Sequence, residues 1–112
     1  MNAAHTRKLR GIKKILMSKE GFIRISTHTY ERLKKRGYTK GDIVSCIMNG
    51  TIVEVQTGLN HDLDKLTFNY VIVGRDQDNN PIVIVLSEEG KNHFKVITVM
   101  PPIDNKRFTD CV

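Results

Sequence analysis

The stretch FNYVIVGRDQDNNPIVIVL, residues 68–86, decides the fold class of this chain. Two runs rich in Val and Ile, 68–74 and 82–86, flank the turn-rich residues 76–81. β-branched residues favour strands, and a polar cluster of Asp, Asn and Pro favours a tight connection between them. The stretch therefore predicts an antiparallel hairpin.

The same pattern continues on both sides of this hairpin. Residues 87–92 are again rich in turn formers and lead to a third Val- and Ile-rich run, 94–99. Upstream, 51–56 predicts another strand, and 58–66 predicts a polar loop before the hairpin. Pro101 and its proline neighbour would end the last strand.

A basic amphipathic segment lies near the start of the chain. Between Arg7 and Met17, apolar residues recur every three or four positions with Lys and Arg between them, which predicts a helix with one apolar face. That face can pack on a sheet, dock a partner or lie on a membrane. Packing is the default, and the scarcity of large aromatics makes the membrane the weakest interpretation.

A short strand and a capped helix are expected next. Residues 22–25 favour a strand, and Ser26 or Thr27 can cap a helix over 28–36 that ends at Gly37. In this helix Tyr30 and Leu33 are expected on the inner side.

A further helix begins at Thr39, where Asp42 completes a capping box, and ends at Asn49-Gly50. Its wide apolar face predicts deep packing and consists of Ile43, Val44, Ile47 and Met48.

These elements predict one α+β domain, with N-terminal helices packed on an antiparallel sheet of about four strands. We divide the chain into a basic N-terminal helix at 1–20, the α+β domain at 21–102 and a loose C-terminal tail at 103–112.

Several classes of protein are not expected. The chain has no apolar run of about 18 residues and no signal-peptide core, so we expect a soluble cytoplasmic protein without a membrane partner. Cys46 and Cys111 have no metal or disulfide spacing, and the four histidines are scattered, so we expect no metal and no cofactor. Gly74 and Gly90 lack a phosphate-loop setting, which argues against nucleotide binding.

The charge is distributed unevenly along the chain. Residues 1–40 hold twelve Lys or Arg against two Glu, a net charge of +10, whereas the remainder holds six against ten, a net charge of −4. A concentrated positive potential attracts phosphate backbones. The pattern predicts RNA as the partner, with a solvated basic face that only aids solubility as the alternative.

The candidate catalytic residues are His28, Arg32 and Arg36, which follow one another at four-residue intervals and so form a row on a helix. Histidine titrates near neutrality and guanidinium groups clamp phosphate, so the row holds the parts needed for metal-independent cleavage of RNA by its 2′-OH. Thr98 is a further candidate, because its hydroxyl can point into a groove beside this helix. The same residues also fit an ordinary solvated helix and strand.

Other cations and one aromatic can contact or stack on RNA, although spacing alone selects none of them. These candidate RNA-binding residues are Arg24, Tyr30, Lys34, Lys35, Arg10, Lys13 and Lys14.

Residues 27–39, with Asp42, Asn49-Gly50 and Ile97-Thr98-Val99, resemble the pattern of an uncharacterised bacterial domain of unknown function. The resemblance covers about residues 22–102. That domain is similar to BrnT and RelE-like toxins, of a wider group with barnase and EndoU.

The resemblance implies a toxin-type ribonuclease restrained by an antitoxin or immunity protein. It implies an acid–base role for His28 and phosphate binding by Arg32 and Arg36, with Thr98 at the end of the last strand. The chain departs from the pattern at Met100, where similar domains have an aromatic, usually Tyr. Two classes of function stay open: an RNA-cleaving enzyme, and a non-enzymatic module that binds RNA or protein on the same fold.

Overall fold

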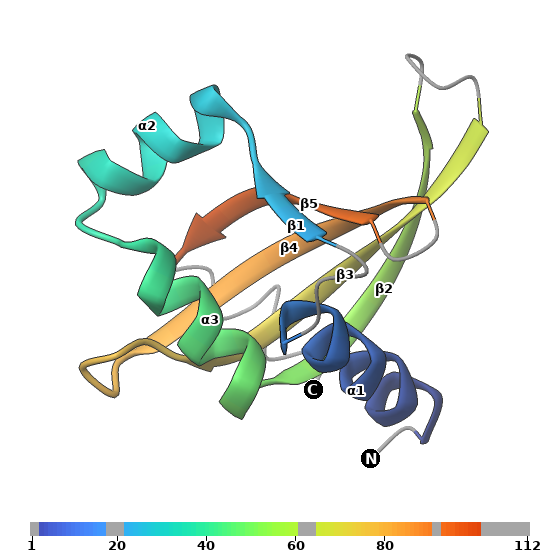
Figure 1. Cartoon of the computed structure of the whole chain (residues 1–112), viewed down its shortest axis with the longest axis horizontal. Helices are drawn as coiled ribbons and strands as arrows, with labels where there is room; N and C mark the ends of the chain where they lie inside the picture. Colours follow the sequence, from blue (N-terminus) through green and yellow to red (C-terminus); the bar gives the residue numbers. More distant parts are fainter. Residues whose placement is uncertain (1–2, 18–21, 61–64, 91–92, 102–112) are drawn as a thin grey trace.

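The computed structural model describes residues 3–17, 22–60, 65–90 and 93–101. Its frame is a five-stranded sheet with the strand order β1-β5-β4-β3-β2 (Figure 1). The strands are β1 (Phe22–Ile25), β2 (Thr51–Asn60), β3 (Lys65–Arg75), β4 (Pro81–Gly90) and β5 (His93–Met100). The helices are α1 (Ala3–Met17), α2 (Thr27–Lys35) and α3 (Lys40–Asn49).

The α+β class is confirmed, but the sheet has five strands and is mixed. β2 to β5 pair antiparallel in sequence order, whereas β1 pairs parallel with β5, from Phe22 opposite His93 to Ile25 opposite Val96. The sequence predicted the short strand without its place in the sheet. A parallel pair joins segments far apart in the chain, so no local turn signal announces it.

The loop predicted at 58–66 was wrong at both ends, while 61–64 lie outside the described residues. β2 continues to Asn60 and β3 already begins at Lys65, and the two strands form a long ribbon that extends beyond the helices (Figure 1). Thr57 pairs with Phe68, and Asn60 pairs with Lys65. Gly58 and Asn60 belong to residue types that are depleted in strands, so propensity hid this part of β2.

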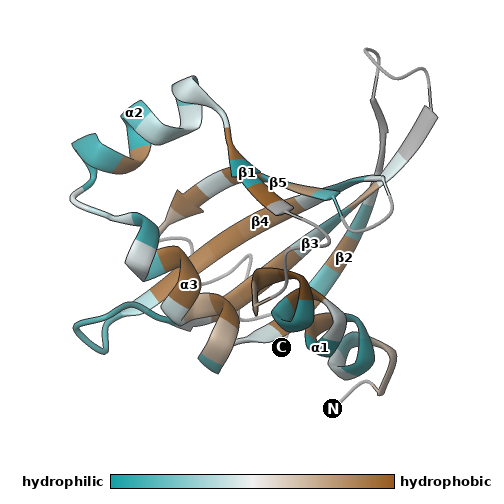
Figure 2. Cartoon of the chain, viewed as in Figure 1, coloured by the Kyte–Doolittle hydropathy of each residue, from teal (hydrophilic) through white to brown (hydrophobic). Residues whose placement is uncertain are grey.

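One face of the sheet carries the main core. The buried residues of this cluster are Leu9, Ile12, Leu33, Ile43, Cys46, Ile47, Ile52, Tyr70, Ile72, Ile82, Ile84, Leu86, Phe94, Val96 and Val99. α1 contacts β2, β1 and α3, and α3 contacts β3 and β4. Figure 2 shows β4 as mostly hydrophobic and α2 as mostly hydrophilic. We call this side of the sheet the helix-covered face.

α1 confirms the predicted amphipathic helix and begins at Ala3, ahead of the expected Arg7. Leu9 and Ile12 are buried in the core shared with the sheet. No helix in the described part of the chain is long and apolar enough to cross a bilayer. The burial of Leu9 and Ile12 shows that α1 packs its apolar stripe within the domain.

The predicted caps are present. The Ser26 side chain accepts a hydrogen bond from the Thr29 backbone N–H at 3.2 Å, and Gly37 takes a φ of 80° just past α2. Thr39 and Asp42 form the capping box at the start of α3. Asp42 also accepts from the Gln77 backbone N–H at 3.1 Å, which ties α3 to the turn between β3 and β4.

Two expectations about burial were wrong. Val44 and Met48 are each 42% exposed, although they belong to the predicted apolar face of α3. Tyr30 was expected on the inner side of α2 and is 38% exposed. Burial depends on what covers a residue, and Tyr30 and Val44 line a cavity instead of packing fully against a neighbouring element.

α3 approaches β3 closely enough to require glycine. A Cβ on Gly74 would lie 2.6 Å from the Cys46 carbonyl oxygen and 2.9 Å from Asn49 Oδ1. A Cβ on Gly11, in α1, would meet no atom within 4 Å.

We predict opposite effects for alanine at these two positions. Gly74→Ala should lower the free energy of unfolding by about 1–3 kcal/mol, because backbone atoms must move apart. Gly11→Ala should raise the free energy of unfolding by about 0.5–1 kcal/mol, because alanine gives the unfolded chain less conformational entropy to lose on folding. Urea denaturation measures both, and equal effects of the two variants would contradict the close approach.

Burial also sets the chemistry of Cys46. Its side chain is fully buried, with Sγ 3.8 Å from the carbonyl oxygens of Ile72 and Ile82. Burial raises the pKa of the Cys46 thiol from 9.0 to about 12, because the thiolate loses its hydration.

A raised pKa in the folded state gives stability that is present below pH 9.0 and lost as the pH rises toward about 12. We predict that Cys46→Ala reduces the fall in unfolding free energy across this range. Denaturation curves recorded through it would show the difference in slope. An unchanged slope would mean that other groups, such as Tyr70, cause the alkaline loss.

Candidate functional site

α2 covers the half of the β5 edge that β1 leaves open. β1 pairs only with residues 93–96 of β5. Beyond them the Thr29 hydroxyl donates to the Ile97 carbonyl at 3.4 Å, and Arg36 Nη1 donates to the Val99 carbonyl at 2.6 Å. Leu33, between these two residues on the helix, is 1% exposed. We call Thr29, Leu33 and Arg36 the inner line of α2.

The inner line divides the exposed surface of α2 into two flanks. At about 3.6 residues per turn, His28, Arg32 and Lys35 fall on one side of it, which we call the histidine flank. Tyr30 and Lys34 fall on the other side, the tyrosine flank. All five side chains are exposed. His28, Arg32 and Arg36 of the predicted row are all exposed, but Arg36 differs from the other two because its Nη1 donates to the Val99 carbonyl of β5.

Thr98 lies on the same side of the sheet as the histidine flank. It pairs with Val85, which belongs to a cluster separate from the main core and formed by Val71, Val83 and Val85. This valine cluster defines the face opposite the helix-covered face. Tyr30 borders a cavity with Ile43, on the helix-covered face, so the histidine flank turns toward the opposite face and Thr98.

Met100 also lies on this opposite face. It pairs with Val83 and packs against the valine cluster. Its side chain therefore fills apolar space beside Thr98, which is partly exposed.

The tyrosine flank holds a cluster that the sequence did not single out. The Nζ atoms of Lys34 and Lys40 each lie 5.6 Å from the centroid of the Tyr30 ring, a distance at which cation–π attraction acts. The four-residue spacing alone predicts that Tyr30 and Lys34 are neighbours, one turn apart on α2. Lys40 comes from α3, so only the tertiary structure brings it to the ring.

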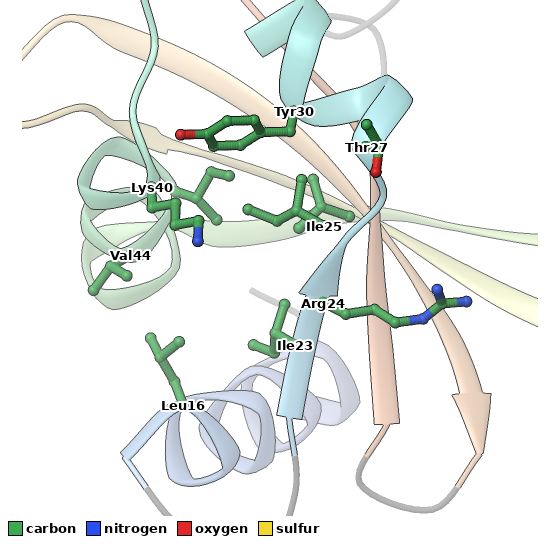
Figure 3. Close-up of a pocket in the computed structure, with 10 residues that line it drawn as sticks. Leu16, Ile23, Arg24, Ile25, Thr27, Tyr30, Lys40 and Val44 are labelled. Carbon is green, nitrogen blue, oxygen red and sulfur yellow. The ribbon is translucent and has the colours of Figure 1, made fainter. Parts of the chain in front are cut away.

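The cluster borders a cavity of about 490 Å³ between α1, β1, α2 and α3 (Figure 3). Its walls are Leu16, Ile23, Arg24, Ile25, Thr27, Tyr30, Lys40, Ile43, Val44 and Val96. Figure 3 shows the Lys40 side chain reaching into the cavity and the Arg24 side chain pointing away from it.

The other predicted RNA-binding cations lie apart from α2. Arg10 and Lys13 line a cavity of about 290 Å³ on α1, and Lys14 is exposed on the same helix. Figure 1 shows α1 and α2 at opposite ends of the helical layer. Arg24 pairs with Glu89, from Nη2 to Oε1 at 2.9 Å. The basic N-terminal region therefore forms two separate surfaces.

A polar cluster on the helix-covered face was also missed. The Tyr70 hydroxyl donates to Glu88 Oε1 at 2.9 Å, and Lys8 Nζ lies 3.4 Å from Glu88 Oε2. Burial, followed by the contact with Glu88, raises the pKa of Tyr70. Glu88 stands in a turn-like stretch of sequence with no motif around it, so no local signal marked it. The cluster holds α1 to β3 and β4.

No three His, Cys, Asp or Glu side chains among the described residues lie close enough together to hold a metal ion.

A family model described as a domain of unknown function, DUF4258, matches residues 25–101. The chain belongs to this family. The DUF4258 match begins at the last residue of β1 and ends just after β5, so it contains both flanks of α2 and leaves α1 outside. Searches of curated proteins and of solved structures found no match.

We predict that the two arginines of this DUF4258 domain differ in their effect on stability. Arg36→Met should lower the free energy of unfolding by about 1 kcal/mol, because the Val99 carbonyl loses its donor. Arg32→Met, the matched control, should change it by less than about 0.5 kcal/mol. Thermal or urea denaturation tests this, and equal losses would show that the hydrogen bond of Arg36 contributes nothing.

Proposed function

We propose that this domain is a metal-independent endoribonuclease that binds RNA through α2 and cleaves it by attack of a ribose 2′-OH on the adjacent phosphate. The observation that carries the proposal is the histidine flank. His28 and Arg32 are both exposed, are one turn apart, and face the side of the sheet that bears Thr98.

Each side chain has a defined part in the proposed reaction. His28 takes the proton of the 2′-OH, the 2′-oxygen bonds to phosphorus, and the bond to the 5′-oxygen breaks. The imidazolium then returns its proton to the departing 5′-oxygen, leaving a cyclic phosphate and a 5′-OH. Arg32 stabilises the charge that develops on the phosphate. The Thr98 hydroxyl can donate to a non-bridging phosphate oxygen.

Arg36 has a positioning part in this scheme. Its Nη1 is held by the Val99 carbonyl, while a guanidinium has further N–H donors that remain available for phosphate. A guanidinium fixed in this way loses less side-chain entropy when it binds a ligand. Substitution of Arg36 is therefore expected to affect both the fold and RNA cleavage.

The wider role is part of the same proposal. A toxin of the cytoplasm that attacks messenger or transfer RNA, restrained by an antitoxin or immunity protein, fits the resemblance of the sequence to BrnT and RelE-like toxins. The net charge of +6 supports a polyanionic substrate.

A second candidate function is a non-enzymatic RNA-binding module. The tyrosine flank favours it, because the Nζ atoms of Lys34 and Lys40 both lie 5.6 Å from the centroid of the Tyr30 ring. An exposed ring can stack on a base while the two ammonium groups contact the backbone, which suits single-stranded RNA. This function needs no histidine.

His28→Ala separates the two functions. For an enzyme, cleavage of purified bacterial RNA in EDTA should fall by about 10²-fold or more, while RNA affinity in a gel-shift assay changes little. His5→Ala on α1 is the matched control and should cut RNA at the original rate.

Two other results would contradict the proposed enzyme mechanism. Cleavage that persists in His28→Ala would remove His28 from the mechanism. RNA that stays intact but shows salt-sensitive binding, lost on Tyr30→Ala, would favour the binding module.

A further inference from the structure

The helical layer is incomplete above β1. α3 contacts β3 and β4, and α1 contacts β2 and only touches β1. The remaining space is the cavity of about 490 Å³ described above (Figure 3). Most of its wall is aliphatic, from Leu16, Ile23, Ile25, Ile43, Val44 and Val96. Val44 and Tyr30, at its rim, are 42% and 38% exposed, so the cavity opens to solvent as a groove.

The groove runs beside an open strand edge. β1 is the terminal strand of the sheet and pairs only with β5, and no strand among the described residues pairs with its outer side. An edge of this kind presents backbone N–H and C=O groups that a further strand can satisfy. Since the groove and the edge adjoin, one extended segment can contact both.

The two faces of β1 differ in chemistry. Ile23 and Ile25 border the groove, whereas Arg24 alternates to the opposite face, beside Lys95 in register. Glu89 pairs with Arg24, and Lys95 has no ion pair with any described residue. A strand added to this edge would therefore meet aliphatic side chains on one face and excess positive charge on the other.

We propose that this groove and the outer edge of β1 together bind an extended segment of a protein partner, with aliphatic and acidic residues in alternation. The segment adds to the sheet as a strand beyond β1. Its aliphatic side chains enter the groove, and its carboxylates lie beside Arg24 on the other face of β1, with Lys95 one strand further into the sheet. The proposal does not depend on RNA cleavage, because none of its contacts involves the histidine flank.

Other occupants fit the groove less well. RNA would bring phosphates against an aliphatic wall whose inward-pointing cation is Lys40 (Figure 3), and burying charge there without partners is costly. A partner helix satisfies its own backbone and would leave the edge of β1 unpaired. An alternating strand satisfies the edge and matches both faces.

A synthetic peptide tests the proposal on the full chain. The probe is acetyl-VEIDVEI-amide, and its control has the same composition with the acids grouped, acetyl-VIVIEDE-amide. Nitrogen-15 NMR should show that the alternating peptide shifts the amides of β1 and of the first turn of α3, and slows hydrogen exchange on β1. The grouped peptide should bind with a dissociation constant at least about 10-fold higher.

Variants locate the contact. Val44→Glu should weaken binding of the alternating peptide about 10-fold or more, because it places a carboxylate on the rim of the groove. Val55→Glu is the matched control, since Val55 is 37% exposed on β2, and it should bind the peptide as the parent chain does. The spectrum of each unbound variant verifies its fold.

Several outcomes would overturn the proposal: no shifts at peptide concentrations that saturate a weak site, equal binding of the two peptides, or a Val44→Glu variant that binds unchanged. Displacement of the peptide by oligouridylate, with the same amides shifted, would assign the groove to RNA. Concentration-dependent shifts of these amides without peptide would assign it to a second copy of the chain.

Discussion

The unpaired half of the β5 edge is the constraint on which the candidate site depends. β1 ends opposite Val96, and the carbonyl groups of Ile97 and Val99 would otherwise lack protein partners. Backbone groups at a sheet edge need donors or water. α2 supplies two donors, Thr29 and Arg36. The chain passes from β1 to α2 through the single cap residue Ser26, so the helix that covers this edge must start where β1 stops.

The position of α2 along this edge determines toward which side of the sheet each of its exposed residues faces. The histidine flank meets the side of the sheet with the valine cluster, and the tyrosine flank meets the groove above β1. The proposed RNA cleavage and the proposed partner docking would thus use different sides of α2. A protein strand on β1 would lie next to Tyr30 but not over His28, so it would affect base stacking more directly than proton transfer.

The sequence predicted features whose causes are local. Ser26, Gly37 and the pair Thr39 and Asp42 act within one turn of helix, and the structure confirms each of them. The parallel partner of β1 lies near residue 94, beyond the reach of any local pattern. The burial of Val44 was misjudged for a related reason, since an apolar residue is buried only where another element covers it.

The candidate site was predicted in part. Four-residue spacing placed His28, Arg32 and Arg36 in one row, but each such step advances by slightly more than a full turn. Two steps bring Arg36 close enough to β5 for its Nη1 to donate to the Val99 carbonyl, while its side chain stays exposed. Lys40 joins Tyr30 only through the packing of α3 beside α2. Residue type and spacing thus predicted that these side chains lie on one helix, and tertiary packing determined which of them contact β5 and α3.

Met100 narrows the chemistry that this domain can perform. Its side chain packs on the valine cluster beside Thr98 and cannot exchange a proton. Arginine stays protonated in proteins, and a threonine hydroxyl does not ionise near neutrality, so neither Arg32 nor Thr98 can serve as a base. Among the proposed catalytic residues, His28 is then the one whose side chain can both accept and donate a proton. A mechanism on the histidine flank must therefore use one imidazole twice, first to take the proton of the 2′-OH and then to return it to the 5′-oxygen.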